Sequence, residues 1–473
     1  MRSARNGAAR GIRFADFDHT LFACNSTELF IASCKPVLLV AVLDLLIRRC
    51  VPWQLVGLQQ WFRLRDFACC FCILLLMPWN LLIWRRAAPG LYARLESAAV
   101  AERLRRADPR DVVIVSFGMT FVIRHLLRGS PWQDCRLIAT PWLPGWRHFR
   151  SGKLHLVAPH FSAAEIARAW FITDSRDDGD LLAAVGEGEL ITPQGEPFRA
   201  SERLYLPLRY TAAAKYTRSY VLDQILLVDI LLLALSLGTS PDALLAALCC
   251  VPFLTLSLMC VYEIGYYEND MVAARKEKSP TLRCEAANFR DFPIEPNAWI
   301  WAAASGAAGL AMAHGMGLLG PLGLGLGGAC WAAMLLAQRA VFYLYNRRTP
   351  KSRMLLYPVL NMLKFAPVFV LMPPTKLGVV LALSQVMTMW AVYITYRHGG
   401  DHTKIRKESL RLVLFGIGVV LLLSSAPLAG LGGGFQLGMI TAWLLLRLGK
   451  APILAARARR RPEGSLLVAR QGS

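Results

Sequence analysis

The chain has 473 residues, of which 55% are hydrophobic, and its formal net charge is +21. This length exceeds what one ordinary hydrophobic core holds. The apolar excess lies mainly after residue 218, in runs that approach the ~20 residues needed to cross a bilayer. Basic residues gather at the ends of these runs, which indicates the cytoplasmic loops of a membrane protein and excludes nucleic acid as the expected partner.

Three compact apolar runs in the first 200 residues, 12–17, 112–117 and 169–173, end at polar or glycine-bearing turns. Such runs predict buried parallel strands that feed helices, as in an α/β Rossmann-like domain. About 90 residues of helical character between the first two runs are expected to form a helical cap. Its most apolar stretch, 71–84, is expected to rest on a membrane surface, with a re-entrant or spanning hairpin as the alternative. No secretory signal precedes Asp16, so this domain is expected to stay in the cytoplasm.

Asp16 and Asp18 follow the first run and are two residues apart. One such carboxylate can attack phosphorus, while the other protonates the leaving oxygen and then activates water. Ser116, at the end of the second run, is expected to hold a phosphoryl oxygen, and Lys153 to neutralise the phosphoryl group. The acidic residues after the third run are expected to hold Mg²⁺ together with Asp16 and Asp18. They are Asp174 and Asp178.

In this order, the motifs resemble those of the haloacid dehalogenase superfamily, most closely its phosphoserine-phosphatase-like branch, over about residues 11–190. The resemblance implies an Mg²⁺-dependent phosphatase domain at 1–198, with Thr20 contacting the substrate beside Asp16 and Asp18. His19 and Thr173 stand where the family usually has glycine, and the bulky His19 ring is expected to narrow substrate choice. Two alternatives are a non-catalytic domain of the same fold and acidic residues that only cap strand-to-helix turns.

A basic connector at 199–218 precedes eight candidate membrane spans. The longer loops between spans are rich in Lys and Arg, whereas the alternate connections carry almost none. The positive-inside rule therefore places the basic loops, the connector and the tail on the cytoplasmic side of a bacterial inner membrane. This predicts an all-α polytopic transmembrane bundle at 219–456 and a basic, disordered tail at 457–473. The spans lie at about 220–238, 243–262, 297–315, 317–340, 354–372, 377–396, 411–427 and 434–450.

The segment after the second candidate span mixes acidic and basic side chains at a membrane mouth. Carboxylates there can hold Mg²⁺ on a diphosphate, while Lys and Arg stabilise the leaving charge; an ordinary solvated loop is the alternative. The side chains concerned are Glu268, Asn269, Asp270, Glu277, Lys278 and Arg283.

This arrangement resembles the UbiA prenyltransferase superfamily over about residues 203–450, nearest to its polyprenyl-phosphate phosphoribosyltransferase branch. The resemblance implies metal binding by Asn269, Asp270 and Glu277. Ala273 stands where the family has aspartate, so metal binding depends on compensation by Glu263 or Glu268. Further substrate contacts are implied for the loops that carry Arg347, Arg348 and Asp401.

Together the two resemblances imply a bifunctional enzyme that uses Mg²⁺. It would transfer phosphoribose from phosphoribosyl diphosphate to polyprenyl phosphate and hydrolyse the phosphate monoester of the product. One alternative is a prenyltransferase that moves an isoprenoid diphosphate onto an aromatic acceptor. The other, favoured by Ala273, is a membrane-anchored phosphatase whose UbiA-like part only binds lipid.

Overall fold

The computed structural model describes residues 11–56, 61–105, 107–142, 152–195, 200–215, 220–276, 282–289, 292–349, 352–424, 427, 433–459 and 466–467. The chain divides into two compact units, an N-terminal unit, Met1–Tyr205, and a helical unit, Leu206–Ser473. Most of the tail predicted to be disordered lies outside the described residues.

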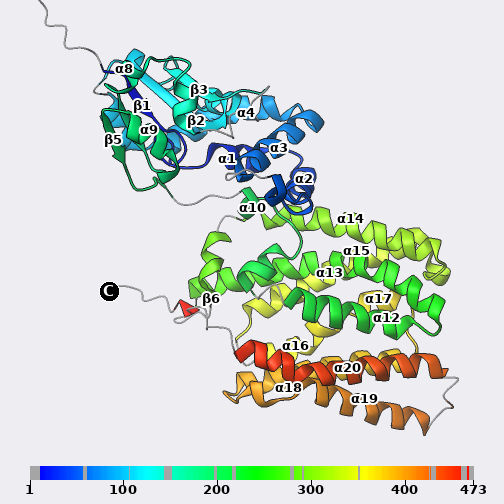
Figure 1. Ribbon diagram of the computed structural model, residues 1–473. Coiled ribbons are helices and arrows are strands. Elements are labelled where there is room, and N and C mark those ends of the chain that lie inside the picture. Colours follow the sequence, from blue (N-terminus) through cyan, green and yellow to red (C-terminus); the bar gives the residue numbers. More distant parts are fainter. Residues whose placement is uncertain are drawn as a thin grey trace, which may run out of the picture. The chain divides into compact units, whose positions relative to one another are not determined.

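The N-terminal unit is built on a five-stranded parallel sheet in the order β3-β2-β1-β4-β5 (Figure 1). The central strand β1 pairs with β2 on one side and β4 on the other, so that Phe14 lies beside Val113 and Phe171. All three side chains are buried, which explains why the sequences of these strands are continuous apolar runs. The predicted parallel strands are thus confirmed. The strands are β1 Arg13–Ala15, β2 Val112–Met119, β3 Arg136–Thr140, β4 Trp170–Thr173 and β5 Glu187–Leu190.

Helices occupy the long connection between β1 and β2, and Figure 1 shows the blue helices α1 to α3 gathered beside the sheet. Arg48 ties three of them together by pairing with Glu28, Asp44 and Asp66. The connection contains α1 Ser26–Ser33, α2 Val37–Cys50, η1 Trp53–Val56, α3 Trp61–Leu76, α4 Asn80–Leu95 and α5 Ala98–Arg105. The remaining helices of the unit are η2 Pro109–Asp111, α6 Thr120–Leu127, α7 Lys153–Val157, α8 Ala163–Ile166, η4 Arg176–Asp178, α9 Gly179–Ala184 and α10 Ala200–Arg203.

The apolar stretch 71–84 breaks at Pro78, between α3 and α4, instead of forming one long helix. Large apolar side chains at this break are exposed: Leu75 by 66%, Leu76 by 62%, Trp79 by 47% and Leu82 by 57%. The opposite face of each helix is buried against the unit. The break therefore forms an apolar tip on the cap, defined by these four exposed residues.

The helical unit begins with two π-helices, η5 Thr211–Lys215 and η6 Val221–Ile230. Helices follow almost without interruption: α12 Leu231–Leu237, α13 Pro241–Lys276, η7 Cys284–Phe289, α14 Ile294–Gly315, η8 Gly320–Leu322, α15 Gly323–Arg347, α16 Arg353–Met362, α17 Ala366–Leu371, α18 Lys376–Arg397, η9 His402–Lys404, α19 Lys407–Leu423 and α20 Gly433–Arg459. Two short strands, β6 Leu282–Arg283 and β7 Leu466–Leu467, pair antiparallel.

Three of the described helices are long and apolar enough to cross a membrane: Pro241–Arg275, Gly320–Arg347 and Lys376–Arg397. The first and third contain the predicted spans 243–262 and 377–396, and the second covers residues 320–340 of the predicted span 317–340. Two of the other five predicted spans, 297–315 and 434–450, lie within the single helices α14 and α20, which are less apolar than these three. Among the described residues, the remaining three predicted spans have no helix of this length. The first is divided between η6 and α12, that at 354–372 is divided between α16 and α17, and α19 has 17 residues. Membrane association is supported, whereas the predicted count of eight spans is not.

Candidate active site

The loop after β1 positions both carboxylates of the first motif at the carboxyl edge of the sheet. The backbone N–H of Asp16 continues the strand pairing by donating to the Ile172 carbonyl, at 2.9 Å. Asp18 Oδ1 accepts from the Ser26 backbone N–H at the start of α1, at 2.6 Å. Ser116 Oγ lies 3.5 Å from Asp18 Oδ2. The first and second motifs therefore meet, as the sequence predicts.

Ser116 lies inside β2, which continues to Met119, so the prediction that it ends its strand is wrong. The pairing of β2 with β3 shifts register between Val115 and Met119. This irregularity frees Ser116 from the regular ladder, and its Oγ accepts from the Gly118 backbone N–H at 2.9 Å. An apolar run alone does not reveal such a bulge.

Lys153 joins two of the predicted carboxylates. Its Nζ lies 2.5 Å from Asp16 Oδ1 and 2.8 Å from Asp178 Oδ2, and its side chain is 3% exposed. Thr173 Oγ1 makes a second bridge, 3.1 Å from Asp16 Oδ2 and 2.5 Å from Asp178 Oδ2. The residue that replaces the usual glycine thus contributes a hydroxyl to the site, a role that its position in the sequence does not indicate.

Gly152 allows Lys153 to enter the site at the first residue of α7. A Cβ at this position would lie 2.0 Å from Asp180 Oδ2. That same oxygen accepts from the Leu154 backbone N–H at 2.8 Å and holds the start of the helix. The close approach of the Asp180 carboxylate therefore requires glycine before the lysine.

Thr20 lies between two loops and does not line the cavity. It is fully buried, and its Oγ1 donates to Asp174 Oδ1 and accepts from the Asp174 backbone N–H, each at 3.0 Å. This arrangement fixes the loop after β4 against the loop after β1. The described contacts of Thr20 are therefore structural, and its predicted contact with substrate stays a prediction.

Burial and neighbouring charges shift the proton affinity of these groups. Burial raises the pKa of Asp16 to about 7, although Lys153 opposes the rise and Asp178 adds to it. Burial also raises the pKa of Asp18, against the hydrogen bonds from Ser26. For Lys153, burial alone would lower the pKa, but Asp16 and Asp178 reverse the effect and raise it. Lys153 therefore stays a cation at neutral pH.

A cavity of about 270 Å³ opens above these groups and includes Asp16, Asp18, Ser116, Lys153 and Asp178 in its wall. Helix α3 of the cap supplies another part of the wall, through Phe62, Arg63, Asp66 and Phe67. Their spacing places them on one face of a helix. The cavity therefore has carboxylates and Lys153 from the sheet edge on one wall and aromatic and charged groups from the cap on another.

The cap residues Arg63 and Asp66 have no signal in the motif spacing. The Arg63 guanidinium lies 3.8 Å from the ring centre of Phe117, and its Nη2 lies 4.0 Å from Asp177 Oδ2. Asp66 Oδ1 faces Arg65 Nη2 at 2.8 Å and Arg48 Nη1 at 3.4 Å. Burial raises the pKa of Asp66 to about 6. Helix α3 therefore brings both a positive and a negative side chain to the cavity wall.

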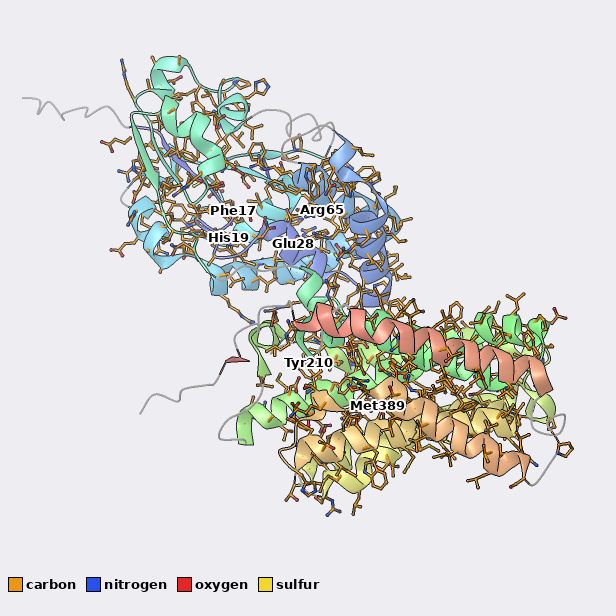
Figure 2. The ribbon with its side chains drawn as sticks, turned by 60° about the horizontal axis from the view of Figure 1, so that its bottom comes forward. Phe17, His19, Glu28, Arg65, Tyr210 and Met389 are labelled. Carbon is orange, nitrogen blue, oxygen red and sulfur yellow. The ribbon has the colours of Figure 1, made fainter. Side chains whose placement is uncertain are left out.

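His19 also lines the cavity, as its place beside Asp18 suggests. Its backbone is left-handed, with φ of 59°, a conformation that costs a residue with a side chain more than it costs glycine. The loop after β5 holds it there: the Gln194 backbone N–H donates to the His19 carbonyl at 2.6 Å. Figure 2 shows His19 beside Phe17 on the loop that follows β1.

The donor chemistry of the cavity suits Mg²⁺. Among the described residues, no three His, Cys, Asp or Glu side chains form a ready-made metal cluster. However, six aspartates line the cavity against two cationic side chains, Arg63 and Lys153. A phosphate dianion would be repelled by this excess of negative charge unless a cation joined it. Mg²⁺ prefers carboxylate oxygens, and Asp16 and Asp178, which share Lys153 and Thr173 as partners, are the residues that would hold it.

The carboxylates predicted to form the membrane-mouth site have protein partners in the helical unit. Asp270, at 3% exposed, accepts from the Tyr210 hydroxyl at 2.7 Å and pairs with Lys215 at 2.5 Å. Asn269 Nδ2 reaches the same carboxylate at 3.4 Å. Figure 2 labels Tyr210 in this unit. The structure thus brings Asn269 and Asp270 together, with a lysine as the counter-ion.

Glu268 and Glu263 are also occupied by protein groups. Glu268 Oε2 pairs with Arg339 at 2.8 Å. Glu263 is fully buried, and its Oε1 accepts from the Thr211 backbone N–H at 2.8 Å and hydroxyl at 2.9 Å. Either carboxylate would have to leave these partners to compensate for Ala273 in metal binding.

The remaining predicted contacts are spread over separate loops. Arg283 pairs with Glu285 at 3.1 Å, and the Arg347 guanidinium lies 3.3 Å from the ring centre of Tyr343. Asp401 Oδ1 accepts from the Thr403 backbone N–H at 3.0 Å and so caps its own turn. The side chain of Arg348 is exposed, while its carbonyl accepts from Arg353. Glu277 and Lys278 lie outside the described residues.

In comparisons with known proteins, the chain matches no family model, no curated protein and no solved structure. Its function is therefore inferred from the chemistry of its own sites.

Proposed function

We propose that the N-terminal unit is an Mg²⁺-dependent phosphatase that hydrolyses phosphate monoesters, with Asp16 as the nucleophile. The observation that carries this proposal is the double bridge from Lys153 and Thr173 to Asp16 and Asp178 in the wall of a cavity. Such an arrangement fixes the attacking carboxylate and supplies positive charge where the phosphoryl group would gain negative charge.

In the proposed reaction, an Asp16 oxygen attacks phosphorus and the bond to the alcohol oxygen breaks. Asp18 gives its proton to that oxygen, which fits a buried carboxyl whose pKa is raised. The phosphoaspartate is then cleaved by a water molecule whose proton returns to Asp18. Lys153 and Ser116 would bind the phosphoryl oxygens throughout. When bound by Asp16 and Asp178, Mg²⁺ would neutralise phosphate charge.

The cap wall favours a small, polar alcohol as the leaving group. Phe62 and Phe67 offer aromatic faces, while Arg63 and Asp66 offer charged hydrogen-bonding groups. A phosphosugar presents both an apolar ring face and hydroxyls, so it suits this wall better than a simple alkyl phosphate. This supports a sugar phosphate as the substrate class.

A second activity is proposed for the helical unit: transfer of phosphoribose from phosphoribosyl diphosphate to polyprenyl phosphate. It is favoured by buried ionisable groups in a unit with membrane-length helices, such as Asp270 near the end of Pro241–Arg275. Both active sites would face the cytoplasm from the inner membrane. The ion pairs of Asp270 with Lys215 and of Glu268 with Arg339 equally suit the alternative in which this unit binds lipid without transfer.

Metal removal tests the phosphatase. The full-length protein, purified in detergent, should hydrolyse ribose 5-phosphate with added Mg²⁺, lose this activity in EDTA, and regain it when Mg²⁺ is restored. Phosphate release measures the rate, and Asp134→Asn, an exposed position outside the cavity, is the matched control. An EDTA-treated protein that retained the full rate would contradict the proposed use of metal.

A further inference from the structure

Glu408, near the start of α19, holds two guanidinium groups in the helical unit. Arg447 of α20 reaches its Oε1 at 2.7 Å, and Arg411 contacts its Oε2. Each carboxylate oxygen therefore serves one arginine, and one positive charge remains without a partner of opposite sign in this cluster. Both arginines are largely buried, at 2% exposed for Arg411 and 9% for Arg447.

The cluster, at the start of α19, contacts the middle of another helix, one of membrane-spanning length. Arg411 Nε donates to Gln385 Oε1 at 2.6 Å, and Gln385 is itself buried on α18, Lys376–Arg397. At 1.5 Å per residue, Gln385 lies roughly 14 Å from the beginning of α18 and roughly 18 Å from its end. An unbalanced charge that is buried in a unit with membrane-spanning helices is costly, so such a charge is a candidate binding site.

The unused hydrogen-bonding groups of the two arginines are all donors. Arg447 Nε is buried without a partner in the part of the chain that the structure describes. Arg411 bonds through Nε and Nη1, and no described residue accepts from its Nη2. Both oxygens of Glu408 are already taken. A ligand for these donors must therefore supply several acceptor oxygens and negative charge, as a phosphate group does.

Neighbouring charges do not cancel the excess. Asp229 of η6 pairs with Lys364 at 3.4 Å and accepts from Gln224, so its charge is already balanced. Asp223 approaches Arg447 with its backbone carbonyl, at 3.5 Å from Nη1. Asp223 and Asp229 belong to η6, a ten-residue π-helix. Such helical geometry is rare and recurs at functional sites.

We propose that Arg411 and Arg447 form an anion site in the helical unit that binds a phosphate monoester. The phosphate can come from the head group of an isoprenoid lipid phosphate or from free phosphate, because both present the same oxygens. Preference for the lipid form rests on the proposed transfer to polyprenyl phosphate. The anion site itself rests only on the two arginines.

Binding to the full-length protein in detergent tests the site. The Asp16→Asn background prevents hydrolysis, and calorimetric titrations use farnesyl phosphate, inorganic phosphate and, as the uncharged control, farnesol. Arg447→Gln should weaken farnesyl phosphate binding by roughly tenfold or more, since it removes charged hydrogen bonds. Glu408→Gln should instead tighten binding, because it removes the competing carboxylate. Any phosphate binding in the N-terminal cavity should be unchanged in both variants.

Arg353→Gln is the matched control for a buried arginine. Arg353 is 8% exposed and donates to the carbonyls of Tyr345, Asn346 and Arg348, so it has a structural role. Its replacement should lower the melting temperature and leave the affinity unchanged. If Arg447→Gln and Glu408→Gln behave like this control, the cluster is a structural ion triad and the proposal is overturned. It is also overturned if no phosphate ligand binds in an Arg447-dependent way.

Two further outcomes separate this site from the proposed function. Equal, Arg447-dependent binding of farnesyl phosphate and inorganic phosphate would support the anion site and identify free phosphate as its ligand. Arg447-dependent binding in a protein whose wild type shows no phosphatase or transferase activity would also support the site, while the proposed function would fail.

Discussion

In the N-terminal unit, Asp16 and Asp178 share one ammonium group in the wall of a cavity, whereas in the helical unit Asp270 has both Lys215 and Tyr210 as partners. The first arrangement leaves negative charge in excess and open to a ligand. The second balances its charge within the protein. Aspartate thus lines a cavity in one unit and is paired internally in the other, and sequence motifs do not distinguish the two states.

The largest expected effect tests the first half of this comparison. Asp16→Asn removes the proposed nucleophile and should lower Mg²⁺-dependent phosphate release by roughly a thousandfold or more. The amide keeps the shape of the side chain, so the melting temperature should change little. Asp134→Asn should retain the wild-type rate. Hydrolysis by Asp16→Asn at the wild-type rate would remove the basis for the phosphatase.

Asp270→Ala tests whether the balanced carboxylate in the helical unit is also catalytic. If Asp270 binds Mg²⁺ or diphosphate, the variant should stop the transfer of label from radioactive phosphoribosyl diphosphate to polyprenyl phosphate. The reason is a loss of ~3–4 kcal/mol of transition-state stabilisation. Phosphatase activity should be unaffected. Counting label in the lipid phase of membranes gives the result.

Lys215→Met is the control for Asp270→Ala, because it breaks the same ion pair and leaves the carboxylate in place. Either variant should lower the stability of the helical unit by about 1–3 kcal/mol, seen as a lower melting temperature. Equal labelling by the two variants, per folded protein, would show that Asp270 is structural and that the transfer site lies elsewhere.

The pH dependence of the proposed phosphatase activity tests the role of Asp16. Burial raises the pKa of Asp16 to about 7, and the nucleophile must be deprotonated, so kcat/KM at limiting Mg²⁺ should rise as pH increases through about 7. Saturating Mg²⁺ should move this rise to lower pH, since a cation favours the carboxylate. A profile that is flat between pH 5 and 8 at limiting Mg²⁺, roughly one to two units on either side of this pKa, would contradict the assignment.

The same shift has a consequence for stability. The folded-state pKa of Asp16 lies above its ordinary value of 3.8, so the folded state binds a proton more readily than the unfolded state between these values. This carboxyl therefore favours folding at low pH, and its contribution is lost as pH rises through about 7. Asp16→Asn should weaken this dependence in urea unfolding of the N-terminal transition.

The smallest expected effect concerns His19. Glycine adopts a left-handed backbone without strain, so His19→Gly should raise the stability of the N-terminal unit by about 0.5–1 kcal/mol. Loss of the ring from the cavity should also widen the range of phosphate esters hydrolysed. Urea unfolding and a panel of sugar phosphates measure the two effects. A decrease in stability would mean that the His19 ring contributes more by packing than its backbone costs.

Features of the N-terminal site that follow from strand order could be predicted from the sequence, whereas those that depend on tertiary packing could not. The meeting of Asp16, Ser116, Lys153 and Asp178 was predictable because parallel strands deliver their following loops to one edge of a sheet. The cap contribution of Arg63 was not, because a helical stretch does not reveal which face meets the sheet. Pairs such as Asp270 with Lys215, 55 residues apart, depend on tertiary packing and leave no local signal.

The number of membrane-spanning helices could not be predicted from hydropathy alone. Average apolarity predicted eight, yet the π-helix η6 and the break between α16 and α17 interrupt two of those segments. Hydropathy measures composition and does not register where backbone hydrogen bonding changes. The buried pair of Asp229 and Lys364 joins residues that are 135 positions apart. The hydropathy of either segment alone could not predict this pair.

The apolar tip of the cap has a practical consequence for preparing the protein. Leu75, Leu76, Trp79 and Leu82 are exposed apolar side chains close to Pro78 in the sequence, and exposed apolar surface promotes self-association in water. A fragment ending at residue 205, although it lacks the three described helices of membrane-spanning length, should therefore precipitate or form soluble aggregates at high concentration. Replacing Leu75 and Leu82 with glutamate should make that fragment monodisperse and suitable for crystallisation.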